Sequence, residues 1–318
     1  MTDLPRWGVV STIRAPLAQI LDFAAWHLDL GADRIYIYLD ESAPDTLGVL
    51  NAHPAIRALH TDADWWAKRK GRPDKHQVRQ SLNARHANNR KPEVEWLVHI
   101  DVDEFILPKA PVSEQLSALP REALCARVRP VEALAPLPGS DPVLRLFKAF
   151  HLDQMRRQAA SEACFPTYGP HLSGGFLSHV AGKLFFRTGL KGLQIKIHNV
   201  ILNGEQNPGE VALTGIELGH FHAADWEHFL SAYRFRLQKG SYRAELKPQV
   251  RRSNALNLHD FLTGLEARGG TDALRAFFEE VCTATPALCD RLRQEGVLRG
   301  WRMDFREVRE RHFPGLGS

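Results

Sequence analysis

The sequence predicts an α/β fold: a Rossmann-type sheet with a helical C-terminal extension. The first observation is a strand–helix–strand pattern within the first forty residues, which requires a parallel sheet with a right-handed crossover. The second is the stretch Trp96–Phe105, a short apolar run that ends in three acidic residues within four positions. We expect the α/β domain to cover residues 1–240 and the extension to cover residues 241–318.

The composition is that of an ordinary globular protein. The 318 residues are 44% hydrophobic and 25% charged, enough to form a sizeable core. A net charge of +4 is too balanced to indicate a nucleic-acid partner. The cysteines show no Cys-x-x-Cys spacing and are expected to be reduced thiols of a cytoplasmic protein. No run predicts a secretion signal or a membrane span, so any membrane contact would be peripheral.

The first elements follow from hydrophobic spacing. Residues 7–13 read as a buried strand, Pro16 is well placed to begin a helix, and Gly31 is well placed to end it. Residues 35–39 read as a second buried strand that ends at Asp40. A polar, basic segment then precedes a helix of weak amphipathicity from 75 to 90.

The acidic end of the stretch 96–105 indicates a ligand site. Buried strands do not tolerate unpaired carboxylates, so these acids are expected where the strand leaves the sheet. Asp101 and Asp103 are two residues apart and project to the same side of an extended chain, where Mg²⁺ or Mn²⁺ fits between them and a phosphate. The alternative is ordinary loop polarity or a helix cap.

The segment Ile100–Phe105, Ile-Asp-Val-Asp-Glu-Phe, resembles the Asp-x-Asp signature of family-2-like glycosyltransferases, which have the GT-A fold. The branch it resembles has the motif Trp-x-x-x-x-Asp-x-Asp-Glu-Phe, and residues 26–42 are similar to the same branch. In that family the acid ending the second strand contacts the nucleoside of the sugar donor, a role that falls on Asp40. The chain departs from the family at Ile13-Arg14-Ala15, where Asn-Glu is usual; Arg14 either contacts phosphate or faces solvent.

The resemblance implies further donor-binding residues, each of which has a solvent-exposed charge or polar group as its alternative. Together with Asp40 and Asp101 they are Gln77, Arg79, Asn83, Lys183, Arg236 and Lys239. It also implies a third metal ligand at His220. Its neighbour His222 would lie on the same side of a strand but is expected to pack beside the next helix.

The rest of the chain is predicted more coarsely. Segments 124–128, 182–187 and 194–198 read as strands, 144–155 as strand or helix, and 165–175 as loop. Helices are expected at 225–240, 255–267, 271–282 and 287–298.

The expected function is metal-dependent, inverting transfer of a sugar from a nucleoside-diphosphate sugar, with a UDP-sugar favoured, to a saccharide or glycolipid hydroxyl. Inversion requires a general base, for which Glu104, Asp153, Glu162 and Asp225 are candidates. Two alternatives are a metal-dependent nucleotide or phosphoester hydrolase and a non-catalytic saccharide-binding protein of the same fold. The oligomeric state is not indicated.

Overall fold

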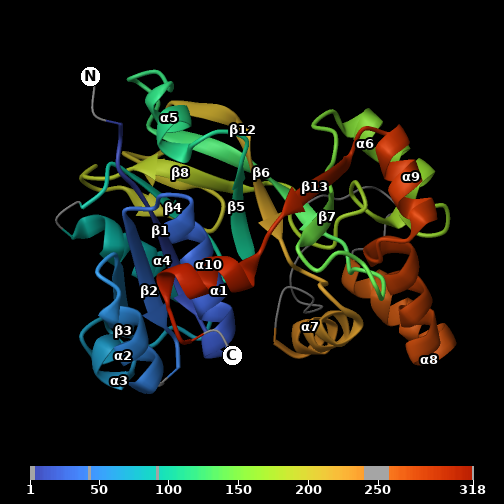
Figure 1. Ribbon diagram of the computed structural model, residues 1–318, viewed down its shortest axis with the longest axis horizontal. Helices are drawn as coiled ribbons and strands as arrows, with labels where there is room; N and C mark the ends of the chain where they lie inside the picture. Colours follow the sequence, from blue (N-terminus) through green and yellow to red (C-terminus); the bar gives the residue numbers. More distant parts are fainter. Residues whose placement is uncertain (1–3, 42–43, 91–92, 240–257, 317–318) are drawn as a thin grey trace. The chain divides into compact units, whose positions relative to one another are not determined.

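A computed structural model of the chain describes residues 4–41, 44–90, 93–239 and 258–316 (Figure 1). The chain divides into two compact units. Unit 1 comprises Met1–Pro130, Ala181–Leu218 and Asp304–Ser318, and unit 2 comprises Val131–Val180 and Gly219–Met303.

Unit 1 is built on a parallel sheet, whose first two strands lie where the sequence predicts them. Its parallel strands, in spatial order, are β3 (Ile56–His60), β2 (Arg34–Leu39), β1 (Trp7–Ile13) and β4 (Trp96–His99). The antiparallel strands β8 (Lys183–Arg187) and β6 (Cys125–Ala133) continue the sheet beyond β4. This arrangement confirms the predicted α/β class and its Rossmann-type parallel sheet.

Further strands complete the architecture of this unit. Strand β12 (Glu210–His220) pairs with β5 (Glu104–Pro108) and with β6, and both β6 and β12 run on into unit 2. A small antiparallel sheet consists of β9 (Gln194–Ile195), β10 (Val200–Leu202) and β11 (Glu205–Gln206). The strand predicted at 194–198 is therefore limited to its first two residues.

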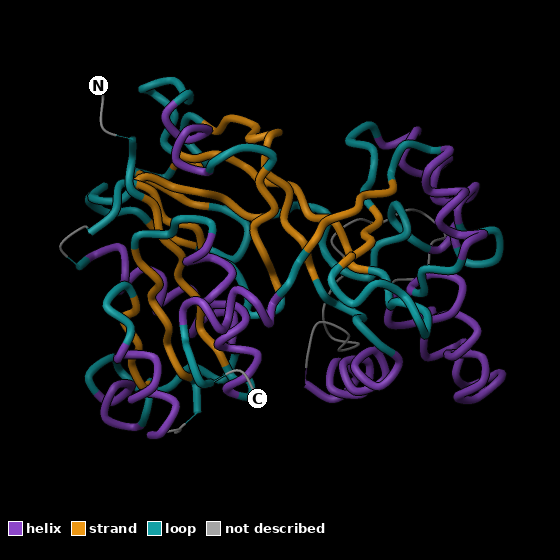
Figure 2. The backbone as a smooth tube through the Cα atoms, in the orientation of Figure 1, coloured by secondary structure: helices purple, strands orange, loops and turns teal. Residues whose placement is uncertain are grey.

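The helices of unit 1 pack along its strands, as the purple and orange tubes of Figure 2 show. They are α1 (Leu17–Asp29), α2 (Pro44–Ala52), α3 (Ala63–Ala67), α4 (His76–Asn89), α5 (Val112–Ser117) and α10 (Phe305–His312). On one face of the sheet, Ala84 and Ala87 of α4 join Val10, Tyr36 and Tyr38 in a buried cluster. Because neighbouring strand residues point to opposite faces, strands buried on both sides need continuous apolar runs.

Helix α10 ties the C-terminal end of the chain to the strand that follows the acidic motif. Its Phe305 ring lies 4.9 Å from the Phe105 ring, and Arg309 forms an ion pair of 2.6 Å with Asp22 of α1. Residues 304–318 therefore belong to unit 1, whereas the predicted boundary placed them in a separate extension.

Unit 2 combines a short antiparallel sheet with helices. The last residues of β6 pair with β7 (Leu144–Lys148), and β7 pairs with β13 (Leu298–Arg302). Its helices are α6 (Gln154–Cys164), the 3₁₀ turn Gly169–His171, α7 (Trp226–Lys239), α8 (Leu258–Cys282, interrupted at Gly269 and Gly270) and α9 (Pro286–Gln294). None of the helices that the structure describes is long and apolar enough to cross a membrane.

Two features of unit 2 differ from the sequence prediction. The division at residue 240 does not coincide with the unit boundaries, because strand pairing joins 131–148 to 298–302. The helix predicted at 287–298 ends already at Gln294. Leu298, the last residue of the predicted range, is the first residue of β13. Residues 298–302 are a strand because they hydrogen-bond to β7, about 150 residues away in the chain. Such a distant pairing produces no recognisable pattern in the local sequence.

A fully buried histidine in unit 1 predicts a loss of stability in mild acid. The Nδ1 of His27 lies 2.7 Å from the carbonyl oxygen of Phe23, so Nδ1 must donate, and Nε2 accepts the N–H of Ile106 at 3.3 Å. Burial lowers the pKa of His27 to about 4 from 6.5, because the charged form would lose its hydration. The unfolded chain therefore binds a proton between these values that the native protein does not, so stability falls as the pH drops.

We expect the part of this loss due to His27 to be roughly 2 kcal/mol between about pH 7 and pH 5. Urea unfolding of wild type and His27→Gln at both pH values would measure it. Because glutamine keeps a donor and an acceptor but does not titrate, the variant should lose less stability. Equal losses in the two proteins would contradict the assignment of the titration to His27.

Candidate functional site

The predicted acids lie at the carboxyl ends of two strands on either side of β1. Asp40 follows β2, and Asp101 and Asp103 follow β4. The chain passes from β1 to β2 in one direction across the sheet, while β4 lies on the other side of β1. Such a reversal of strand order is the place where open α/β sheets bind ligands.

The Asp-x-Asp-Glu segment is held by a buried lysine. The Lys183 ammonium of β8 lies 2.8 Å from Oδ2 of Asp101 and 2.9 Å from Oε2 of Glu104. The same Glu104 oxygen accepts the backbone N–H of Asp101 at 2.8 Å, and the Glu104 N–H donates to the Asp101 carbonyl oxygen at 3.0 Å. These four interactions close the segment into a fixed turn, which we call the acidic turn (residues 101–104).

Lys183 has a different environment from the one its predicted role requires. Its side chain is only 2% exposed, so its ammonium contacts the acidic turn from the protein interior and is not accessible to solvent. Burial lowers the pKa of Lys183, but the carboxylates of Asp101 and Glu104 outweigh burial and raise it overall. The lysine is therefore a permanent positive charge that neutralises one of the carboxylates around it.

The carboxylate of Asp40 forms ion pairs with two arginines. Arg79 of α4 donates to both of its carboxylate oxygens: Nε lies 3.1 Å from Oδ1 and 2.9 Å from Oδ2, and Nη2 lies 2.7 Å from Oδ2. Arg72 donates to Oδ1 at 2.9 Å, and the hydroxyl of Thr61 lies 3.4 Å from the same oxygen. The predicted residues Asp40 and Arg79 thus lie together, and the bidentate pair fixes the orientation of the carboxylate.

One face of helix α4 connects the two acidic positions. Arg79 contacts Asp40, and the next residue, Gln80, donates from its amide to Asp101. Asn83 is fully buried and donates to the Thr12 hydroxyl at 3.1 Å, at the end of β1. Gln77 does not share this face; it lines a separate hollow of about 330 Å³ beside residues 194–197. The sequence prediction missed Gln80, although its spacing of three residues from Asn83 places both on one side of the helix.

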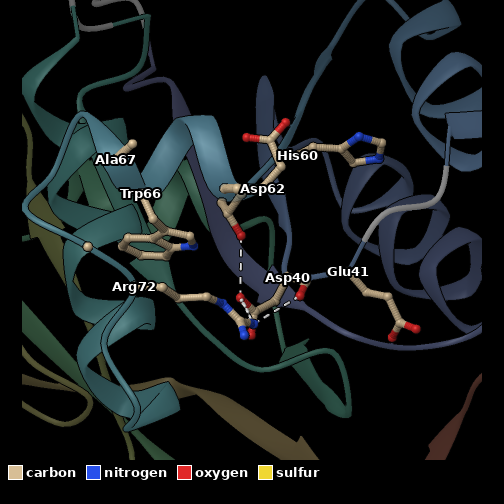
Figure 3. A pocket seen from close by; sticks show the side chains of 10 residues that line it. Asp40, Glu41, His60, Asp62, Trp66, Ala67 and Arg72 are labelled. Atoms are coloured by element: carbon tan, nitrogen blue, oxygen red, sulfur yellow. Dashed lines mark hydrogen bonds and ion pairs between the residues drawn. The ribbon is translucent and has the colours of Figure 1, made fainter.

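A cavity of about 660 Å³ opens at the carboxyl ends of β2 and β3. Figure 3 shows the Trp66 ring, the Arg72 guanidinium and the Asp40 carboxylate on its wall. Its lining comprises Asp40, Glu41, His60, Thr61, Asp62, Ala63, Trp66, Ala67, Gly71 and Arg72. The indole nitrogen of Trp66 is buried and has no hydrogen-bond partner among the described residues.

Arg14 lies in solvent at the edge of this region. Its side chain is 74% exposed and its Nε lies 2.6 Å from a carboxylate oxygen of Glu41. A surface pair of this kind contributes little to stability. An exposed guanidinium is accessible to a phosphate as well as to solvent, so the choice between these two roles for Arg14 stays a prediction.

The remaining predicted residues belong to unit 2, and the side chains of two of them are outside the described part of the chain. His220 ends β12 and belongs to unit 2, as does His222, whose ring centroid is 5.1 Å from that of His220. The metal role of His220 stays a prediction. Arg236 and Lys239 lie in α7, but their side chains are outside the described part of the chain.

The four candidate bases all have structural contacts. Glu104 is buried against Lys183. Asp153 and Asp225 accept the backbone N–H groups of Arg156 and His228, at 2.8 and 2.7 Å, in the first turns of α6 and α7. Glu162 accepts a hydrogen bond of 2.8 Å from Gln158. The role of general base stays a prediction for each of them.

The acidic turn has the oxygen ligands that a divalent cation prefers. Asp101, Asp103 and Glu104 supply three carboxylates, and the Lys183 ammonium contacts two of them. Both oxygens of Asp101 accept hydrogen bonds, from Gln80 and Lys183, and Asp101 and Asp103 are both partly exposed. The metal role of Asp101 and Asp103 stays a prediction. Among the described residues, no three His, Cys, Asp or Glu side chains are grouped as ligands of one metal ion. Mg²⁺ is commonly held by one or two carboxylates plus substrate phosphates.

No family model and no curated protein sequence matches the chain. Among the solved structures that resemble it, two illustrate how weak the similarity is. HddC from Yersinia pseudotuberculosis is 8% identical with a TM-score of 0.37, over 72% of this chain and 97% of that one. Residues 1–349 of TarS from S. aureus are 10% identical with a TM-score of 0.36, over 96% of this chain and 89% of that one. Scores this low support no conclusion about function, which must be inferred from the site itself.

Proposed function

We propose that the protein is a glycosyltransferase that moves a sugar from a nucleoside-diphosphate sugar to a hydroxyl group of a saccharide or glycolipid. One observation carries the proposal. The strands on either side of β1 both end in acids, Asp40 after β2 and Asp101 after β4, and a cavity opens at the ends of β2 and β3. Two neighbouring residues of α4 connect these acids, because Arg79 contacts Asp40 and Gln80 contacts Asp101. A nucleotide-sized pocket beside carboxylates that bind a cation is what recognition of a diphosphate donor requires.

Each part of the site has a role in this proposal. The cavity takes the nucleoside, with Asp40 oriented by Arg79 as an acceptor for its N–H or hydroxyl donors. Asp103 would hold Mg²⁺ or Mn²⁺, and the bound cation would neutralise the charge that develops on the diphosphate leaving group. Lys183 and Gln80 hold Asp101, and with it the acidic turn, in one conformation, so that little reorganisation is needed when the donor binds.

A thermal-shift panel tests the proposal. The intact protein is heated with nucleoside diphosphates and their sugar conjugates, with and without Mn²⁺. We expect one base to stabilise the protein selectively and the stabilisation to increase with the cation, because a ligand that binds only the native state raises its melting temperature. A separate assay of free sugar, run with the stabilising nucleotide sugar and no acceptor, would favour a hydrolase if sugar were released. No stabilisation by any nucleotide would contradict the proposal.

The contact proposed for Asp40 gives a prediction that does not depend on metal. Because Asp40 is assigned to the nucleoside, Asp40→Ala should weaken binding of the preferred nucleoside diphosphate about tenfold even in EDTA, the scale of one or two lost hydrogen bonds. Isothermal titration calorimetry measures this. Asp45→Ala, at an exposed position in α2, is the matched control. Unchanged affinity in Asp40→Ala would reduce Asp40 to a structural partner of the two arginines.

A further inference from the structure

One short loop of unit 1 carries a large local excess of positive charge. Residues 68–75 connect α3 to α4, and we call them the basic loop. The loop contains five basic residues and one acidic residue, and its net charge of +4 equals that of the whole chain. The basic residues are Lys68, Arg69, Lys70, Arg72 and Lys75.

Two of the five cations have structural partners. The Arg69 guanidinium lies 3.4 Å from the centroid of the Trp65 ring and donates to the Trp65 carbonyl oxygen at 2.9 Å. Arg72 pairs with Asp40. Lys68, Lys70 and Lys75 are exposed, and within the described part of the chain none of the three forms an ion pair. The electric field of these three ammonium groups therefore extends into the surrounding solvent.

The cavity next to this loop has no net positive charge of its own to attract an anion. Its lining contains Asp40, Glu41, Asp62 and the cation Arg72, a net charge of −2 when His60 is neutral. Arg79, which pairs with Asp40, and Arg14, which pairs with Glu41, offset these two negative charges. Gly71 and Arg72 belong both to the lining and to the basic loop, so the loop lies on the rim of the cavity. With the whole loop included, the sign of the local charge becomes positive.

We propose that the basic loop steers the anionic donor into the cavity. Lys68, Lys70 and Lys75 attract the diphosphate at long range and accelerate its association, without contacting the bound nucleotide. Fields of this kind raise association rates by about 10- to 1,000-fold and are screened by salt. The proposal rests on the assignment of a nucleoside-diphosphate sugar as donor, and it adds a kinetic role for three residues that the site geometry does not require.

Stopped-flow fluorescence with an N-methylanthraniloyl nucleoside diphosphate of the preferred base tests this role. The triple variant Lys68→Gln, Lys70→Gln, Lys75→Gln is compared with wild type at ionic strengths of about 20 mM and about 500 mM, which change the Debye length several-fold. We expect the association rate constant to fall about tenfold at low salt. At high salt the two proteins should converge, and the dissociation rate constant should be the same throughout.

A matched variant separates a local field from total charge. Lys109→Gln, Arg121→Gln and Lys191→Gln remove the same charge from exposed positions of unit 1 outside the cavity lining. Lys109 and Arg121 flank α5, which lies at the far end of the unit from α3 (Figure 1). The association rate of this variant should stay within about twofold of wild type, because distant charges are screened.

The outcomes distinguish the steering role from the proposed function. If wild type binds a nucleoside diphosphate but the loop variant has the same association rate at low salt, steering is wrong and the donor assignment stands. A faster dissociation that persists at about 500 mM salt would mean direct contact instead of steering. If wild type binds no nucleoside diphosphate, the proposed function fails, and the steering role fails with it.

Discussion

Replacing Asp103 with asparagine is expected to reduce sugar transfer by about 100- to 1,000-fold at saturating donor. A cation on a diphosphate leaving group supplies several kcal/mol of charge stabilisation in the transition state, and each 1.4 kcal/mol is about a factor of ten in rate. Asparagine keeps the shape of the side chain but removes the charge that binds the cation. Steady-state assays at several Mn²⁺ concentrations measure the effect, which excess Mn²⁺ should partly reverse.

The stability of the Asp103 variant should be unchanged or slightly higher. Asp103 is partly exposed and lies two residues from the carboxylate of Asp101, so replacing it relieves the mutual repulsion of these two acids. Asp45→Asn provides a control, since Asp45 is an exposed aspartate in the first turn of α2. If Asp103→Asn transferred sugar at nearly the wild-type rate without added cation, the metal role of this residue would be wrong.

Replacing Lys183 with methionine should lower the free energy of unfolding by about 3–5 kcal/mol, the usual effect of removing one partner from a buried ion pair. Methionine fills a similar volume, so the loss comes from Glu104, whose buried carboxylate no longer has the ammonium beside it. Chemical unfolding at neutral pH measures it. Lys191→Met, at an exposed position of the same unit, should change the free energy little.

A double variant and the pH dependence separate charge from packing. Adding Glu104→Gln to Lys183→Met removes the buried negative charge that has lost the ammonium and should restore part of the lost stability. The raised pKa of Lys183 means that its contribution is fully present below about pH 10.4 and is lost as the pH rises through the folded-state value. If the double variant were as unstable as the single one, the loss would come from packing rather than from the buried carboxylate.

The parallel half of the sheet was predictable because its signals are local. Apolar runs at 7–13 and 35–39 on either side of a helix-period segment can only bury their surface as a strand–helix–strand unit, and the structure has β1, α1 and β2 at these positions. The acids that end β2 and β4 were also visible, since carboxylates after an apolar run must lie where a strand leaves the sheet. Strand β13 was not, because Leu298–Arg302 is strand only through its pairing with β7.

The partners of the acids were decided by tertiary structure. From the sequence, Lys183 was an isolated lysine on a strand, yet pairing of β8 with β4 brings its ammonium between Asp101 and Glu104. Likewise Gln80 and not Gln77 reaches the acidic turn, because the packing of Ala84 and Ala87 against the sheet sets the rotation of α4. Local spacing determines which side chains share a face, but only the packed sheet decides which face meets the site. A carboxylate's position follows from the cost of burying it, whereas its partner comes from whichever distant segment packs beside it.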